Sequence, residues 1–196
     1  MVVLLSIAFG YLFGAIPFAI IIAKLRGVNI MEVGTKNPGA ANVSREVGKV
    51  WGVLVFLLDA LKGVIPMFIA DRVLNLPTYN IHHLFWVGLV GIAAVVGHCW
   101  SAFLGFKGGR GVATTGGVLL YLFPWFFPIA VIAYFVMQKS PRDVRLVIPV
   151  FVFVFGLLIF LYRGSIPWII YFLIIFLIVS FTANREAIRE LKIGDK

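Results

Sequence analysis

Long apolar stretches alternate with short polar segments along this chain. Five stretches stand out, at residues 2–23, 50–70, 84–96, 146–162 and 166–181. A helix needs roughly 20 apolar residues to cross about 30 Å of hydrocarbon, and tilt or short ends allow some variation. The pattern therefore predicts an all-α integral membrane protein.

A sixth apolar stretch, residues 112–137, allows two interpretations. It could form one tilted span, or two short helices folded back at the segment from Pro124 to Pro128. Prolines inside a span are tolerated where neighbouring helices satisfy the freed backbone groups. The apolar pattern alone leaves both arrangements open.

The positions of the cations favour the hairpin, because Lys and Arg collect on the cytoplasmic side of a membrane protein. With the hairpin, 14 of the 17 Lys and Arg residues fall on the inner side, whereas a single span would place the cationic C-terminal tail outside. We therefore expect seven transmembrane helical segments, two of them a short hairpin, with the N-terminus outside and the C-terminus cytoplasmic.

Composition supports lipid as the main solvent of the chain. The sequence is 62% hydrophobic and 13% charged, whereas a soluble domain is nearer to half apolar and a quarter charged. Its 196 residues suit one membrane-embedded domain, 1–196. The first stretch lacks a charged start and is followed by Lys24 and Arg26, which indicates a retained signal anchor.

Charge and cysteine usage exclude other classes. The net charge of +9 comes from cations at the span ends, so the membrane and not nucleic acid is the expected partner. A lone cysteine, Cys99, permits no intrachain disulfide, and no metal-ligand cluster is evident. We expect neither a metal nor a cofactor, and the sequence does not fix the oligomeric state.

Two glycine-rich basic segments interrupt the apolar pattern. Loop 1 is Gly34–Asn42 (GTKNPGAAN), with Arg45 just beyond, and loop 2 runs from Phe103 to Thr115 (FLGFKGGRGVATT) after Gly97-His98. Glycines that expose backbone N–H groups beside fixed cations make anion sites, above all for phosphate. Neither loop fits the nucleotide P-loop pattern. Because both are predicted to be cytoplasmic, they could line one cleft for phosphate-bearing substrates.

Two charged residues lie inside the second span. Asp59 and Lys62 are three residues apart and share a helical face. A charge at membrane depth costs about 2.5–3.5 kcal/mol unless it is paired or faces a wet interior. The pair either lines an active cleft or ties helices together, and both interpretations place it in the bundle interior.

The histidines allow different roles. His98 ends the third span beside loop 2, where it could act as a general base or as a hydrogen-bonding strut. His82 and His83 fall at the other end of the same span, and we expect them to be ordinary loop residues.

The two loops resemble those of the bacterial acyl-phosphate:glycerol-3-phosphate acyltransferases. The first family motif, Gly-Ser-Ile-Pro-Phe and then Gly-Ser-Gly-Asn-Pro-Gly-Ala-Thr-Asn-Val, is similar to residues 14–18 and 34–43. Asp59-x-x-Lys62-Gly63 also matches. The second motif, Gly-His and then Phe-Leu-x-Phe-Lys-Gly-Gly-Lys-Gly-Val-Ala-Thr, is similar to residues 97–98 and 103–114.

The resemblance implies a function and a place in the cell. It implies a seven-helix inner-membrane enzyme whose active site faces the cytoplasm. The substrates would be acyl phosphate and glycerol 3-phosphate, whose sn-1 hydroxyl receives the fatty acyl group. The product would be lysophosphatidic acid, for phospholipid synthesis.

Some positions depart from the family pattern. Arg145 stands for a serine, Asn184 for a histidine, Ala187 for an asparagine, Lys36 for a glycine and Ala41 for a threonine. The family associates several of these positions with holding glycerol 3-phosphate. Arg145 or Lys36 could supply a compensating cation, or the acceptor could be a different polyol phosphate.

The candidate site follows from the loops and the resemblance. Lys107 and the loop 2 glycines would hold one phosphate, and Arg45 the other. The predicted catalytic residues are His98, Lys107 and Arg45. The predicted substrate-binding residues are Thr35, Lys36, Asn37, Gly39, Asn42, Gly108, Gly109, Arg110, Gly111, Thr114, Arg145 and Asn184.

A transporter of phosphate-bearing solutes is the competing class, because intramembrane charges and broken helices occur there too. Against it, neither half of the chain repeats the other in motif or loop pattern. Both informative loops also fall on one face, whereas a translocation path needs access from both. We therefore favour the enzyme.

Overall fold

The structure is a computed structural model that describes residues 1–74, 81–124, 156–157, 161 and 166–194. The chain divides into two compact units, residues 1–127 and 128–196, and each is described by itself. The named elements are α1 (Val2–Gly14), α2 (Phe18–Leu25), α3 (Ala40–Glu46), α4 (Lys49–Leu74), α5 (Ile81–Cys99), η1 (Ala102–Leu104), α6 (Val112–Leu122) and α9 (Ile166–Gly194). Apart from one isolated bridge between Ser101 and Lys107, this described part contains no strand. The predicted all-helical class is confirmed.

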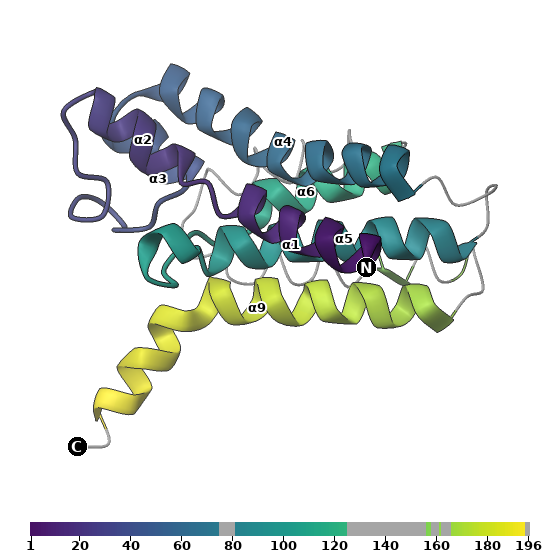
Figure 1. Ribbon diagram of the computed structural model, residues 1–196. Coiled ribbons are helices and arrows are strands. Elements are labelled where there is room, and N and C mark those ends of the chain that lie inside the picture. The colour runs from purple at the N-terminus through teal and green to yellow at the C-terminus, as the bar shows by residue number, and fades with distance from the viewer. Residues whose placement is uncertain (75–80, 125–155, 158–160, 162–165, 195–196) are drawn as a thin grey trace. The chain divides into compact units, whose positions relative to one another are not determined.

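The first unit is a helical bundle built on α1, α4, α5 and α6 (Figure 1). Helices α2 and α3 pack against α4. Val2–Leu25 and Lys49–Val73 are each long and apolar enough to cross a membrane, and shorter apolar helices lie at His83–Cys99, Val112–Leu122 and Pro167–Thr182. Large apolar side chains such as Leu4, Leu5 and Val50 are exposed on α1 and α4, as contact with lipid requires.

Small residues allow α1 and α5 to approach closely. A Cβ atom at Gly14 would clash with the backbone of Ala94, and one at Gly97 would clash with the backbone of Tyr11. At Gly10 the clash would be with Val90. Gly10 and Gly14 are one turn apart, so they form a Gly-x-x-x-Gly face of the kind that allows tight helix packing.

The first apolar stretch is not one continuous helix. Helix α1 ends at Gly14 and α2 begins at Phe18, after the interruption at Ala15–Pro17. Proline lacks an N–H donor, and its ring restricts the preceding residue, so Pro17 favours a break in the helix at this point. The predicted span 2–23 therefore consists of two helices, and the interruption becomes part of the site described below.

The interpretation of His83 as a loop residue is wrong. His83 lies in α5, and its Nε2 atom pairs with the carboxylate of Asp71 in α4. The Tyr121 hydroxyl of α6 donates to the same carboxylate at 2.6 Å. Three helices are thus joined at the end of the bundle remote from loop 2. The side chain of His82 is not among those that the structure describes.

Helix α6 ends at Leu122, just before Pro124. The return half of the predicted hairpin and most of the span at 146–162 lie outside the described residues. The count of seven segments and the orientation of the termini therefore stay predictions. In the second unit, α9 extends beyond the predicted 166–181 as far as Gly194, so the residues after Phe181 continue the helix.

Adjacent glycines in α6 are expected to respond oppositely to alanine. A Cβ at Gly116 meets nothing within 4 Å, whereas one at Gly117 would clash with the Ala60 carbonyl of α4. Gly116→Ala should stabilise the protein by about 0.5–1 kcal/mol through helix propensity. Gly117→Ala should lower the melting temperature, because α4 and α6 must separate. Thermal unfolding in detergent measures both, and equal shifts of the two variants would contradict the described α4–α6 contact.

Candidate active site

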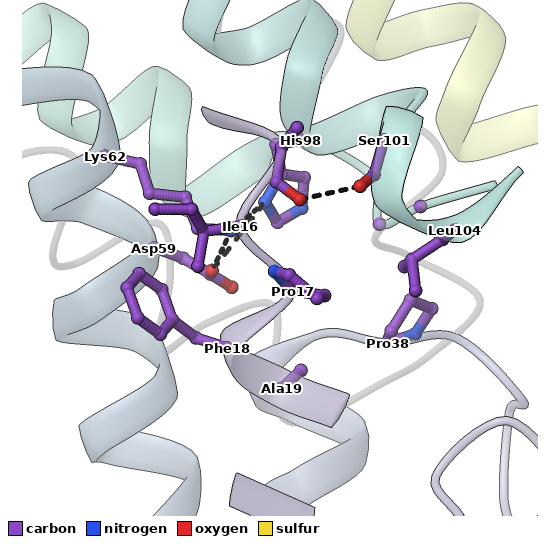
Figure 2. Close-up of a pocket in the computed structure, with 13 residues that line it drawn as sticks. Ile16, Pro17, Phe18, Ala19, Pro38, Asp59, Lys62, His98, Ser101 and Leu104 are labelled. Carbon is purple, nitrogen blue, oxygen red and sulfur yellow. Dashed lines mark hydrogen bonds and ion pairs between the residues drawn. The ribbon is translucent and has the colours of Figure 1, made fainter. Parts of the chain in front are cut away.

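The α1–α2 interruption, loop 1, loop 2, α4 and α5 meet around one pocket (Figure 2). Ala15 to Ala19 line it with backbone and apolar side chains, and Pro38 comes from loop 1. Gly108 and Gly109 come from loop 2. Both loops therefore contribute residues to one pocket, as expected: Pro38 from loop 1, and Gly108 and Gly109 from loop 2.

A buried polar cluster forms the wall of the pocket supplied by α4 and α5. Asp59 Oδ1 lies 2.8 Å from Lys62 Nζ, and both side chains are only 2–3% exposed. His98 Nδ1 lies 3.5 Å from Lys62 Nζ and 3.7 Å from Asp59 Oδ1. The Phe18 ring packs 5.2 Å from Lys62 Nζ. The charges face the interior as expected, and the cluster both lines the pocket and joins two helices.

Loop 2 is fixed to the rest of the bundle by Ser101. Its N–H donates to the Lys107 carbonyl at 3.2 Å, and its carbonyl accepts from the Phe106 N–H at 2.9 Å. Its hydroxyl donates to the Ala15 carbonyl at 2.6 Å. The backbone of Lys107 is therefore held in place while its side chain is exposed.

The loop 2 glycines pack against His98. A side chain at Gly108 would clash with the His98 carbonyl, and one at Gly109 would clash with His98 Nε2. The Gly109 N–H donates to the His98 carbonyl at 3.0 Å, so this amide is already satisfied. Gly111 caps α6 with a φ of 78°, in the left-handed region that glycine tolerates. Close approach and backbone conformation thus account for three of the predicted anion-site glycines.

Loop 1 is shaped by one buried amide. Asn42 is 1% exposed, and its Oδ1 atom accepts from the Thr35 N–H at 3.0 Å. Its Nδ2 atom donates to the Ile30 and Val33 carbonyls at 3.3 and 3.1 Å. Asn42, predicted to bind substrate, therefore holds loop 1 in shape.

The remaining predicted residues divide by position. Lys36 and Arg45 are exposed, whereas Thr35, Asn37, Gly39 and Arg110 are partly buried. Thr114 is fully buried where α6 packs on Gly63 of α4. Asn184 belongs to the second unit, where its amide donates to the Ser180 carbonyl at 2.9 Å, and Arg145 lies outside the described residues. Of the predicted residues, the pocket itself takes in His98, Gly108 and Gly109.

Sequence reasoning missed Ser101 and the backbone of residues 15–17. Ser101 stands in no recognised motif, and its role depends on a carbonyl that is distant in sequence. Among the described residues, no group of three His, Cys, Asp or Glu side chains could hold a metal ion.

Lys36→Gly is expected to stabilise loop 1. Lys36 has a φ of 54°, and a left-handed backbone costs an L-residue roughly 1–2 kcal/mol that glycine does not incur. Part of that gain is offset because glycine is freer in the unfolded chain. The melting temperature should rise slightly, and a lower one would show that the Lys36 side chain makes a compensating contact.

The apolar helices and the buried ionic cluster define an integral membrane protein with a polar site inside its bundle. The chain matches the family model for glycerol-3-phosphate acyltransferase over residues 4–194, and it belongs to that family.

Relatives and solved structures agree with this assignment. A glycerol-3-phosphate acyltransferase of Anaeromyxobacter dehalogenans (strain 2CP-1) is 45% identical over 139 residues, 70% of this chain and 68% of the relative. One from Aquifex aeolicus is 47% identical over 122 residues, 62% of this chain and 60% of the relative. The crystal structure of PlsY (YgiH), an integral membrane glycerol 3-phosphate acyltransferase, in its glycerol 3-phosphate form is 34% identical with a TM-score of 0.77. It covers 98% of this chain and 92% of its own, and its lysophosphatidic acid form gives a TM-score of 0.75 at 33% identity with the same coverage.

Proposed function

We infer that this protein is an enzyme that transfers a fatty acyl group from acyl phosphate to the sn-1 hydroxyl of glycerol 3-phosphate, giving lysophosphatidic acid. The observation that carries this inference is the similarity over 98% of the chain to PlsY in its glycerol 3-phosphate and lysophosphatidic acid forms. The buried cluster and glycine loops around one pocket support it.

The reaction requires no covalent acyl-enzyme, because acyl phosphate is an activated mixed anhydride. The hydroxyl oxygen attacks the carbonyl carbon, and the bond from that carbon to the phosphate oxygen breaks. Phosphate leaves with the electron pair, and the hydroxyl proton passes either to a phosphate oxygen or to a base such as His98. The enzyme must hold hydroxyl and carbonyl about 3–3.5 Å apart.

The cations have the task of holding two anions that repel each other. Lys107, with backbone N–H groups of loop 2 and the polar groups of Thr35 and Asn37, would bind one phosphate. Arg45 would bind the other, assisted by Lys36 or Arg145. Lys107 and Arg45 are exposed beyond the buried cluster, so their charges can reach ligands that enter from water. Backbone N–H groups would also stabilise the oxyanion as it forms.

The site would face the cytoplasm of a bacterial cell, in the inner membrane, within a single domain of seven transmembrane segments. The count of 14 inner cations supports this orientation. The acyl chain would enter from the bilayer between helices, because its tail is insoluble in water.

A test uses purified protein in detergent, where no compartments exist and transport cannot mimic turnover. Acyl phosphate plus glycerol 3-phosphate should yield lysophosphatidic acid and inorganic phosphate in equal amounts. Other polyol phosphates serve as parallel acceptors, because Lys36 and Asn184 depart from the family pattern. Turnover only with another acceptor would revise the substrate. No turnover with any acceptor, together with phosphate flux in proteoliposomes, would overturn the enzyme assignment.

A further inference from the structure

The buried cluster constrains which nitrogen of His98 carries a proton. Lys62 Nζ lies 3.5 Å from His98 Nδ1, within reach of a weak hydrogen bond, whereas Asp59 Oδ1 lies 3.7 Å from the same nitrogen. The Asp59 carboxylate is instead 2.8 Å from Lys62. The closest polar neighbour of Nδ1 among these groups is therefore an ammonium (Figure 2).

An ammonium can only donate hydrogen bonds. When Nδ1 accepts this hydrogen bond from Lys62, a neutral imidazole carries its proton on Nε2. The opposite tautomer would point an N–H at the ammonium. Burial enforces this preference, because Asp59, Lys62 and His98 are only 2–7% exposed and little water can intervene.

The other ring nitrogen, Nε2, lies beside loop 2, whose Gly108 and Gly109 line the pocket together with His98. His98 Nε2 lies against Gly109, so closely that no side chain fits between them. The Gly109 N–H donates to the His98 carbonyl. This hydrogen bond holds loop 2 against the His98 ring. An Nε2–H donor is therefore presented where loop 2 borders the pocket.

We propose that Lys62, held in place by Asp59, is a positioning residue that fixes the tautomer of His98, so that the Nε2–H of His98 donates to a substrate oxygen. The substrate oxygen is a phosphate oxygen or the oxyanion that forms at the acyl carbonyl. His98 then does not remove the hydroxyl proton, which passes to the phosphate. This assignment rests on the proposed function, because it deepens the role of the same site.

The tautomer itself is measurable without any turnover. Protein labelled with ¹⁵N at histidine should show at neutral pH an unprotonated Nδ1 and a protonated Nε2 for His98. A His98→Gln sample identifies the signals to be assigned. A proton on Nδ1 or on both nitrogens in the wild-type protein would overturn the proposal. If the enzyme had no activity with acyl phosphate, this measurement would still decide the tautomer.

Variants of His98 separate a donor from a base. The amide of glutamine can place an N–H near the position of Nε2, whereas the amide of asparagine reaches only about as far as Nδ1. His98→Gln should keep turnover within about 10-fold of wild type, and His98→Asn and His98→Ala should lose roughly 100-fold. Equal loss in all three would contradict the donor role.

Lys62 variants test the positioning role. Lys62→Arg keeps a cationic donor and should preserve the tautomer and most of the activity. Lys62→Met removes the donor, so the His98 proton should move to Nδ1, toward Asp59, and turnover should fall. If the Lys62→Met variant turned over normally and its His98 still carried the proton on Nε2, Lys62 would not fix the tautomer. Should Lys62→Met not fold, the ¹⁵N signals of wild type and Lys62→Arg decide: a proton on Nδ1 in either would overturn the proposal.

Discussion

Lys107→Ala and Arg45→Ala are each expected to lower turnover by about 100-fold or more while the protein still inserts and folds. Both side chains are exposed and lie outside the buried cluster, so their loss leaves the packing of the bundle intact. In the proposed reaction they neutralise two phosphates that would otherwise repel each other, and the charge on the departing phosphate grows as the bond breaks. The formation of lysophosphatidic acid by each purified variant is the measurement.

A matched control removes a cation from the same predicted side of the membrane. Lys24 is exposed near the end of α2, so Lys24→Ala changes the net charge equally without touching either loop. It should keep near-normal activity, which would separate a specific role from general charge. If Lys107→Ala or Arg45→Ala retained wild-type rates, the assignment of that residue to a phosphate would be wrong.

Gly109→Ala should abolish most activity with little change in stability. The added methyl group would clash with His98 Nε2, the far end of a side chain that can rotate away at small cost. The ring would then leave both Lys62 and the pocket. We expect a loss of roughly 100-fold in turnover, comparable to His98→Ala, with a melting temperature near that of wild type.

Gly116→Ala is the control for this substitution. It also adds one methyl group to a glycine close to loop 2, but in open space, and it should remain active. Near-normal turnover by Gly109→Ala would mean that the position of the imidazole ring does not matter for transfer.

The periodic and compositional signals of the sequence predicted the fold where one kind of residue dominates. The apolar stretch at 50–70 is the core of α4. The energetic cost of a charge in lipid placed Asp59 and Lys62 in the bundle interior. These predictions succeed because each follows from the preference of a single residue type for lipid or for water.

Features that depend on a distant partner could not be predicted in this way. The pairing of His83 with Asp71 needs the ends of α4 and α5 to meet. The role of Asn42 in loop 1 depends on two carbonyls whose positions only the folded loop defines. Likewise, the Gly109 N–H donates to the His98 carbonyl, although a glycine-rich pattern suggests that this N–H would bind an anion.

The helix interruption at Pro17 imposes a long-range dependency on the sequence. Breaking α1 leaves the Ala15 carbonyl without a helical partner, and the Ser101 hydroxyl satisfies it at 2.6 Å across 86 positions of the chain. Ala15 is buried, and a buried carbonyl without a hydrogen-bond partner is costly, so the bend and the hydroxyl constrain each other during evolution. A residue with no proposed part in acyl transfer thereby restricts how loop 2 can diverge.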